Sequence, residues 1–174
     1  DLIFHFFRIV TALRPKYFIM ENVPGIASGE HKELLADFIN RFERAGYVMP
    51  AAQILNAAHF GAPQDRRRFI LMGRREDAPS FAFPSPTHRP VRPVRGSEAA
   101  TNLDLPIGAS VWDAIGDLPN LDDFSALASS DKVKLSTSER KATELASSSY
   151  ARRLRGIEAD PMDFSHPRSF DAQW

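Results

Sequence analysis

Two short segments of the sequence carry side chains that could together bind and polarise a heterocyclic ring. Glu21, in the run Glu-Asn-Val-Pro-Gly, offers a carboxyl group that could share a proton with a ring nitrogen. Arg66 and Arg68 offer guanidinium groups that can bind a carbonyl oxygen, a phosphate or a carboxylate. If a strand begins there, Arg66 and Arg68 share one of its faces and Arg67 takes the other.

Each of these residues also has a purely structural interpretation. Glu21 could cap backbone N–H groups in the turn made by Pro24 and Gly25. An isolated run of three arginines is usually a solvated edge. The stretch that leads into the run, residues 61–69 with the sequence Gly-Ala-Pro-Gln-Asp-Arg-Arg-Arg-Phe, is considerably more specific than the arginines alone.

The strands that must position these residues are predicted from apolar runs. Residues 17–20 form a continuous apolar run of strand length, which is typical of a fully buried strand in a parallel sheet. Glu21 would then lie at the carboxyl end of that strand, where open α/β sheets place their ligand sites. Residues 47–55 and 68–73 are predicted as two further strands, which form an antiparallel pair, with a loop at residues 56–64 between them.

The helices are predicted from apolar residues at helical spacing. Residues 1–14 and 30–45 each have an apolar face of this kind. A short helix at residues 110–115 has Ser110 as its N-cap, and residues 150–156 form a helical piece with a basic face. The order of strands and helices predicts half of a doubly wound sheet that ends in an antiparallel pair.

The chain divides into three parts by composition. Residues 1–76 contain the periodic apolar segments, residues 77–108 are rich in proline and form a linker or irregular segment, and residues 109–174 are mixed. The net charge is zero, so binding to nucleic acid would depend on a local cluster of basic residues. Such a cluster is supplied by Arg66, Arg67, Arg68, Arg74, Arg75, Arg89, Arg92 and Arg95.

Composition also limits the class of protein. The chain of 174 residues has no cysteine, so it contains no disulfide and no thiolate metal site, and its scattered histidines predict no metal site of another kind. No apolar run is long enough to span a bilayer, and we expect no membrane partner. The sequence therefore predicts a soluble, cytoplasmic protein.

The motifs resemble those of the DNA (cytosine-5)-methyltransferase family. The Glu-Asn-Val of residues 21–23 is similar to the sixth motif of that family, and residues 61–68 are similar to the eighth, Gly-x-Pro-Gln-x-Arg-x-Arg. The Arg-Ile-Val of residues 8–10, with Leu2 upstream, resembles the end of the fifth motif. Residues 111–119 resemble the segment that leads into the target-recognition region.

The resemblance implies a fold, a cofactor and partners. The fold is α/β, the second half of the Rossmann-like sheet of S-adenosylmethionine-dependent methyltransferases, ending in an antiparallel strand pair and followed by an irregular, partial target-recognition region. Residues 1–76 would belong to the catalytic core and residues 109–174 to the target-recognition region. Double-stranded DNA and S-adenosylmethionine would be its partners, without a metal, in a bacterial restriction-modification system.

The resemblance also implies a role for each candidate residue. Glu21 would contact N3 and the exocyclic amine of a cytosine that is flipped from the duplex. Arg68, with Arg66 in support, would bind O2 and stabilise the charge that builds on the ring. Leu2 would line the pocket for the adenine of the cofactor.

The family's nucleophile is a cysteine, which this chain lacks. We therefore expect a fragment that is inactive alone, with the nucleophile and the main cofactor motif in a missing N-terminal part of the same enzyme. One alternative is a non-catalytic DNA-binding or regulatory module on a methyltransferase scaffold. Another is an unrelated α/β protein whose glutamate and arginines serve a site for an acidic small molecule.

Overall fold

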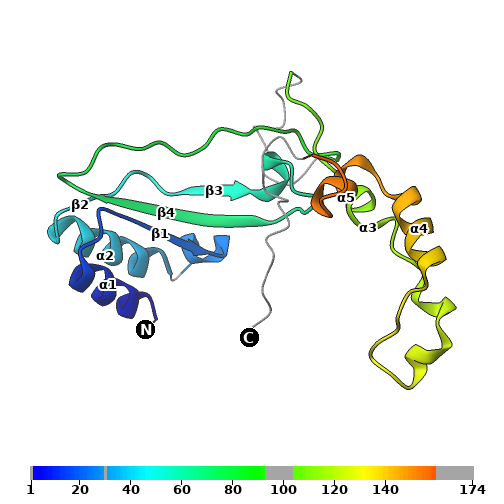
Figure 1. The fold of residues 1–174 in the computed structure, drawn as a ribbon. Coiled ribbons are helices and arrows are strands. Elements are labelled where there is room, and N and C mark those ends of the chain that lie inside the picture. The colour runs from blue at the N-terminus through cyan, green and yellow to red at the C-terminus, as the bar shows by residue number, and fades with distance from the viewer. Residues whose placement is uncertain (1, 30, 93–103, 160–174) are drawn as a thin grey trace.

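The computed structural model describes residues 2–29, 31–92 and 104–159, in which a small sheet is covered by helices on one side (Figure 1). The strands are β1 (Tyr17–Asn22), β2 (Tyr47–Val48), β3 (Gln53–Asn56) and β4 (Arg67–Arg75). Their order is β1-β4-β2, with β3 also paired to β4. All of these pairings are antiparallel, and β4 is the partner of each of the other described strands.

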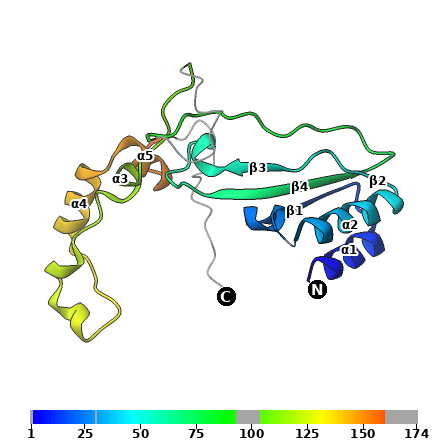
Figure 2. The same cartoon turned by 180° about the vertical axis from the view of Figure 1, so that it is seen from behind.

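Two helices, α1 (Leu2–Leu13) and α2 (His31–Arg44), lie on one side of the sheet, as the front and back views both show (Figures 1 and 2). The 3-10 helix η1 (Pro24–Ala27) joins β1 to α2. Gly46 follows α2 in the left-handed region, with a φ of 84°, as is common after helices. These bounds confirm both predicted helices, although residues 1 and 30 lie outside the described residues.

An aromatic cluster fills the space between these helices and the sheet. Phe38 and Phe42 lie four residues apart on one face of α2, and both are fully buried. The ring of Phe42 stacks on that of Phe18 in β1, with their centroids 4.4 Å apart. Leu71 of β4 is also fully buried in this cluster. Because aromatic rings bury large apolar areas, these contacts hold β1 and β4 against α2.

The prediction that residues 17–20 form a fully buried strand of a parallel sheet is wrong for the described chain. Phe18 and Met20 face the aromatic cluster, but Ile19 on the opposite face is 63% exposed. The strand also runs antiparallel to its partner β4. A continuous apolar run cannot by itself distinguish a strand that is covered on both faces from one covered on a single face.

The strand predicted at residues 47–55 is interrupted. Tyr47 and Val48 form β2, and a second short strand, β3, begins only at Gln53. Pro50 lies in the interruption, and proline has no N–H to donate to a ladder. The antiparallel pair predicted at the end of the sheet is confirmed, since β3 pairs with β4 in this way.

Residues 79–92 run as an extended segment along the sheet, on the side away from α1 and α2 (Figures 1 and 2). The hydroxyl of Tyr17 donates to the carbonyl of Pro79 at 3.0 Å, and the rings of Tyr17 and Phe81 pack edge to face. The predicted irregular segment, residues 77–108, is therefore attached to the sheet near its start. Residues 93–103 lie outside the described residues.

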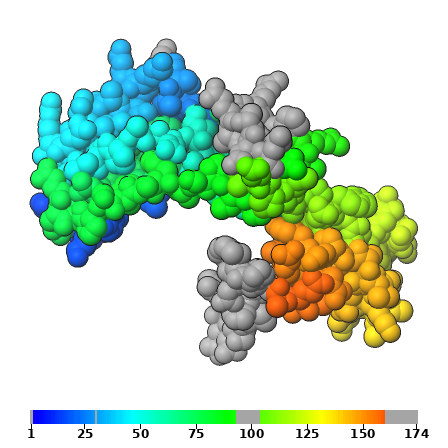
Figure 3. Space-filling view, turned by 90° about the horizontal axis from the view of Figure 1, so that it is seen from above, coloured from blue at the N-terminus to red at the C-terminus, as the bar shows by residue number. Residues whose placement is uncertain are grey.

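The later helices form a lobe at one end of the molecule (Figure 3). They are α3 (Val111–Ile115), η4 (Leu121–Asp123), η5 (Ser125–Ala128), α4 (Thr137–Ala146) and α5 (Ser149–Leu154). α3 begins at the predicted N-cap Ser110, and α5 confirms the helical piece predicted from residue 150. No helix within the described ranges is long and apolar enough to cross a membrane.

An ion pair between a buried carboxylate and a partly exposed guanidinium connects the two ends of this lobe. Asp117, which is 8% exposed just after α3, is bound by both terminal nitrogens of Arg155, which follows α5. The Ser147 hydroxyl also donates to Asp117. The Arg155 guanidinium is the main reason why the pKa of Asp117 falls from 3.8 to about 2, against the opposing effect of burial.

Asp117→Asn should remove most of this electrostatic stabilisation. Because the pKa of Asp117 is lower in the folded chain than in the unfolded chain, the stabilisation is complete above about pH 4 and is lost as the pH falls toward 2. We expect the free energy of unfolding in urea to fall by about 2 kcal/mol at pH 7. The difference from wild type should narrow at pH values near 3. The exposed Asp131→Asn is the control, and an equal loss at both pH values would contradict the prediction.

Candidate active site

The structure brings Glu21 and Arg68 into direct contact. Arg68 Nε donates to Glu21 Oε1 at 2.5 Å, which forms an ion pair between residues 47 positions apart in the sequence. The Glu21 side chain is 52% exposed and that of Arg68 is 24% exposed. A carboxylate and a guanidinium at the same solvent-accessible point can accept from and donate to one ring together.

The register of the β1–β4 ladder explains this contact. Glu21 pairs with Ile70, and Asn22 pairs with Phe69, so Arg68 lies just beyond the end of β1. Phe69 is buried in the core, and side chains alternate along a strand, so Arg68 lies on the opposite face of β4. Glu21 follows the buried Met20 and shares that outer face. Glu21 lies near the end of β1 and Arg68 near the start of β4, and these strand ends are the ones nearer α3 and α5 (Figure 1).

The predicted turn after Glu21 is present. The side chain of Asn22 accepts the Val23 N–H at 2.8 Å, and Pro24 begins η1. Within the described residues, no backbone N–H of this turn donates to Glu21, whose hydrogen-bond partner is Arg68. The capping interpretation of Glu21 is therefore wrong.

Arg66 does not share a strand face with Arg68. β4 begins at Arg67, so Arg66 precedes the strand and is exposed. Its backbone is nevertheless held on both sides, because its N–H donates to the side chain of Asn56 at 3.1 Å and its carbonyl accepts from the Ala57 N–H at 3.0 Å. Arg66 therefore has a fixed backbone two residues before Arg68.

Gly61 is required by its backbone conformation and by a close neighbour. It follows the 3-10 helix η2 (Ala57–Phe60) with a φ of 86°, in the left-handed region that favours glycine. A Cβ at this position would lie 3.0 Å from the ring of His88. The carbonyl of His59 accepts the N–H groups of Thr87 and His88 at 2.9 Å. The loop before Arg66 is thus attached to the extended segment that follows β4.

Leu2 lines a cavity of about 670 Å³ near the end of β1. Leu2 itself is 81% exposed. The lining combines apolar side chains with a few polar ones: Leu2, Ile3, Asn22, Val23, Gly25, Ile26, Ser28, Gly29, His31 and Leu34. The cavity includes Asn22 and Val23, which directly follow Glu21, so it adjoins the ion pair along the chain.

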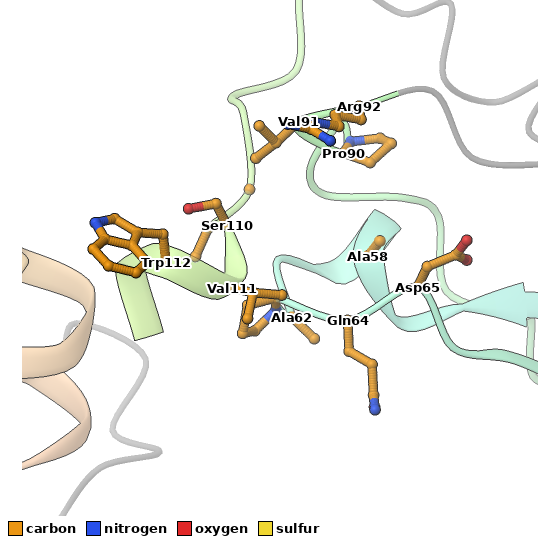
Figure 4. Close-up of a pocket in the computed structure, with 13 residues that line it drawn as sticks. Ala58, Ala62, Gln64, Asp65, Pro90, Val91, Arg92, Ser110, Val111 and Trp112 are labelled. Atoms are coloured by element: carbon orange, nitrogen blue, oxygen red, sulfur yellow. The ribbon is translucent and has the colours of Figure 1, made fainter. Parts of the chain in front are cut away.

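A second cavity, of about 510 Å³, lies between the loop before Arg66, the segment around Val91 and the start of α3 (Figure 4). Ala62 and Val111 both line it, and the Gln64 side chain points away from Val91 (Figure 4). Within the described ranges, no group of three or more His, Asp or Glu side chains is placed to hold a metal ion.

Comparison with known proteins identifies the family. The family model of the C-5 cytosine-specific DNA methylases matches residues 1–162. The chain belongs to this family. The resemblance drawn from residues 21–23 and 61–68 is thereby confirmed, while the roles of the individual residues remain predictions.

This member of the family is similar to several bacterial enzymes. It is 40% identical over 172 residues to the type II methyltransferase M.XorII of Xanthomonas oryzae. The aligned region covers 98% of this chain and 34% of that protein. It is also 40% identical over 83 residues to M1.HphI of Haemophilus parahaemolyticus, covering 48% of this chain and 22% of that protein. The chain thus spans about a third or less of the length of these relatives.

One solved structure, described as a DNA modification methyltransferase encoded within a prophage of E. coli, is 30% identical to this chain. The match covers 41% of this chain and 20% of the other, with a TM-score of 0.39. A score this low carries no argument about the fold. Family membership therefore rests on the sequence matches.

Gly61→Ala should destabilise the loop that carries Arg66. The left-handed conformation costs a residue with a Cβ about 1–2 kcal/mol, and the His88 ring must also move. We expect urea unfolding to give a free energy lower by about 1–3 kcal/mol, with faster exchange of the Thr87 and His88 amides.

Gly25→Ala is the matched control, because a Cβ there would meet no atom within 4 Å and its φ is not left-handed. Adding His88→Ala to Gly61→Ala should recover only the part of the lost unfolding free energy that is caused by the clash with the His88 ring. Equal stabilities of the Gly61→Ala and Gly25→Ala variants would show that the loop does not need glycine.

Proposed function

We propose that this chain is the part of a DNA (cytosine-5)-methyltransferase that holds and polarises the target cytosine. The enzyme would transfer a methyl group from S-adenosylmethionine to C5 of a cytosine flipped out of duplex DNA. The observation that carries the proposal is the contact of Glu21 with Arg68 at an accessible end of the sheet, in a chain of this family.

The two side chains are complementary to one edge of cytosine. The Glu21 carboxylate would accept from the exocyclic amine and share a proton with N3, while Arg68 would donate to O2. Arg68 Nε and Glu21 Oε1 are 2.5 Å apart, so the base would have to separate them as it binds. The amine and N3 of the base would then replace Arg68 as the partner of Glu21, and O2 would replace Glu21 as the partner of Arg68. Arg68 would then stabilise negative charge that develops on the ring, with Arg66 in support.

The cavity beside Leu2 fits part of the cofactor. Its apolar lining, which includes Leu2, Ile3 and Ile26, suits a flat ring such as adenine, and polar side chains of Asn22 and Ser28 are present to orient it. When bound, S-adenosylmethionine supplies the methyl group. We assign residues 1–76 to the catalytic core, of Rossmann-like type, and residues 109–174 to the start of the target-recognition region.

A thiolate has to come from outside these 174 residues, because they contain no cysteine. The proposal therefore expects no methylation of DNA by this chain alone. The lack of cysteine also favours a second candidate function, a non-catalytic DNA-binding module on the same scaffold. Loss of methyl transfer on changing Glu21 in an intact protein would support the enzyme, whereas DNA binding without any methyl transfer would support the module.

Changing the paired residues should reduce methyl transfer by an intact protein that carries this chain. We expect Arg68→Ala to lower kcat about 100-fold or more, because a donor to developing charge is lost. Glu21→Gln keeps the shape of the side chain but cannot share a proton with N3 of the base in the same way, so we expect kcat to fall about 100-fold. Transfer of a labelled methyl group to duplex DNA measures both effects.

Arg44→Ala and Glu43→Gln are the matched controls, since both side chains are exposed near the end of α2. They should retain wild-type rates. Near-normal rates for Glu21→Gln and Arg68→Ala would refute the assigned roles.

A further inference from the structure

Asn56 makes several side-chain hydrogen bonds near the candidate site, although the sequence pattern gave it no role. It ends β3, is 4% exposed and makes three hydrogen bonds through its side chain. Its Oδ1 accepts the N–H groups of Ala58 and Arg66, each at 3.1 Å, and its Nδ2 donates to Asp65 Oδ1 at 2.7 Å. A buried amide with this many partners holds its surroundings in one arrangement.

These bonds close the loop between β3 and β4 at its base. The loop leaves the ladder after Asn56 and returns at Arg67, which is the pairing partner of Asn56. Asn56 binds Ala58 on the outgoing side, and both Asp65 and Arg66 on the returning side. A side chain that bridges both sides fixes where the returning backbone begins β4.

Arg66 depends on this bridge more than Arg68 does. Arg68 lies within the ladder and its side chain is held by Glu21 and by the carbonyl of Arg67. Arg66 precedes the ladder, and its side chain makes no hydrogen bond or ion pair with residues 2–29, 31–92 or 104–159. The point from which the Arg66 side chain extends is therefore set by its backbone, which Asn56 holds.

We propose that Asn56 is a positioning residue that directs Arg66 toward the DNA. This inference rests on the proposed function for its DNA partner, but the structural step can be tested without DNA. Only an amide side chain can make all three bonds, because Oδ1 must accept from two N–H groups while Nδ2 donates to the Asp65 carboxylate. An aspartate at position 56 would instead place two carboxylates in contact.

Exchanging the two side chains gives a sharp structural test. Asn56→Asp alone opposes Asp65, whereas Asn56→Asp combined with Asp65→Asn restores the bond with donor and acceptor reversed. In the 174-residue chain, we expect the Arg66 amide to exchange about tenfold faster or more in Asn56→Asp and Asn56→Ala, and to return toward wild-type rates in the double exchange. Asn40→Ala, on the exposed face of α2, is the control.

The DNA step is tested by fluorescence anisotropy with a labelled duplex that contains a cytosine opposite an abasic site. We expect Arg66→Ala and Asn56→Ala each to weaken binding about tenfold, because a charge-assisted bond is lost in both. The double variant should bind about as well as either single variant, since Asn56 acts through Arg66. Additive losses would overturn the positioning role.

The outcomes separate the two proposals. If the Arg66 amide exchanges at wild-type rates in Asn56→Ala, the positioning role is refuted, whatever affinity the variants show for the duplex. If exchange changes as expected but Arg66→Ala binds the duplex normally, the DNA role of Arg66 fails and Asn56 positions a residue without that function. If the wild-type chain does not bind the duplex, the DNA role of Arg66 in this chain fails and amide exchange decides whether Asn56 holds Arg66, whereas the proposed function is decided by methyl transfer in the intact protein.

Discussion

The backbone ladder of β4 is the constraint on which the other described features depend. Every other described strand pairs with β4, and its side chains alternate between the aromatic core and the opposite face, which carries Arg68. Phe69 and Leu71 fix which face is buried, so Arg68 must lie on the other face, with Glu21 beside it. A slip of one residue would exchange the two faces and bury a guanidinium in a cluster of phenylalanines.

The sequence predicts most of the helices and strands of this chain, but less of how they pair and pack against one another. The helices over residues 1–14 and 30–45 follow from apolar spacing, because that spacing is produced by the same packing that buries Phe38 and Phe42. The direction in which β1 pairs and the exposure of Ile19 depend on which elements cover each face. α4 was not predicted, although Ser136 and Glu139 form a capping box at its start.

The candidate site shows the same division. Glu21 and Arg68 were identified by residue type and position, and the structure joins them. Their mutual contact could not be predicted, because it depends on the register between distant strands. Arg66 was expected to share a face with Arg68 only if the strand began before it, and the pattern could not show that β4 begins at Arg67. Asn56 was missed because a buried amide is recognised by its partners, and these become visible only when the loop is closed.

The ion pair between Glu21 and Arg68 also affects what the site excludes. A free anion such as phosphate or chloride could bind Arg68 Nε only by displacing the Glu21 carboxylate, and it would leave that carboxylate without this partner. A neutral ring that carries both a donor edge and a carbonyl oxygen satisfies the two groups at once. The resting contact thus favours a ligand that matches this hydrogen-bond pattern over one that offers negative charge alone, because Nε of the guanidinium already has a carboxylate partner.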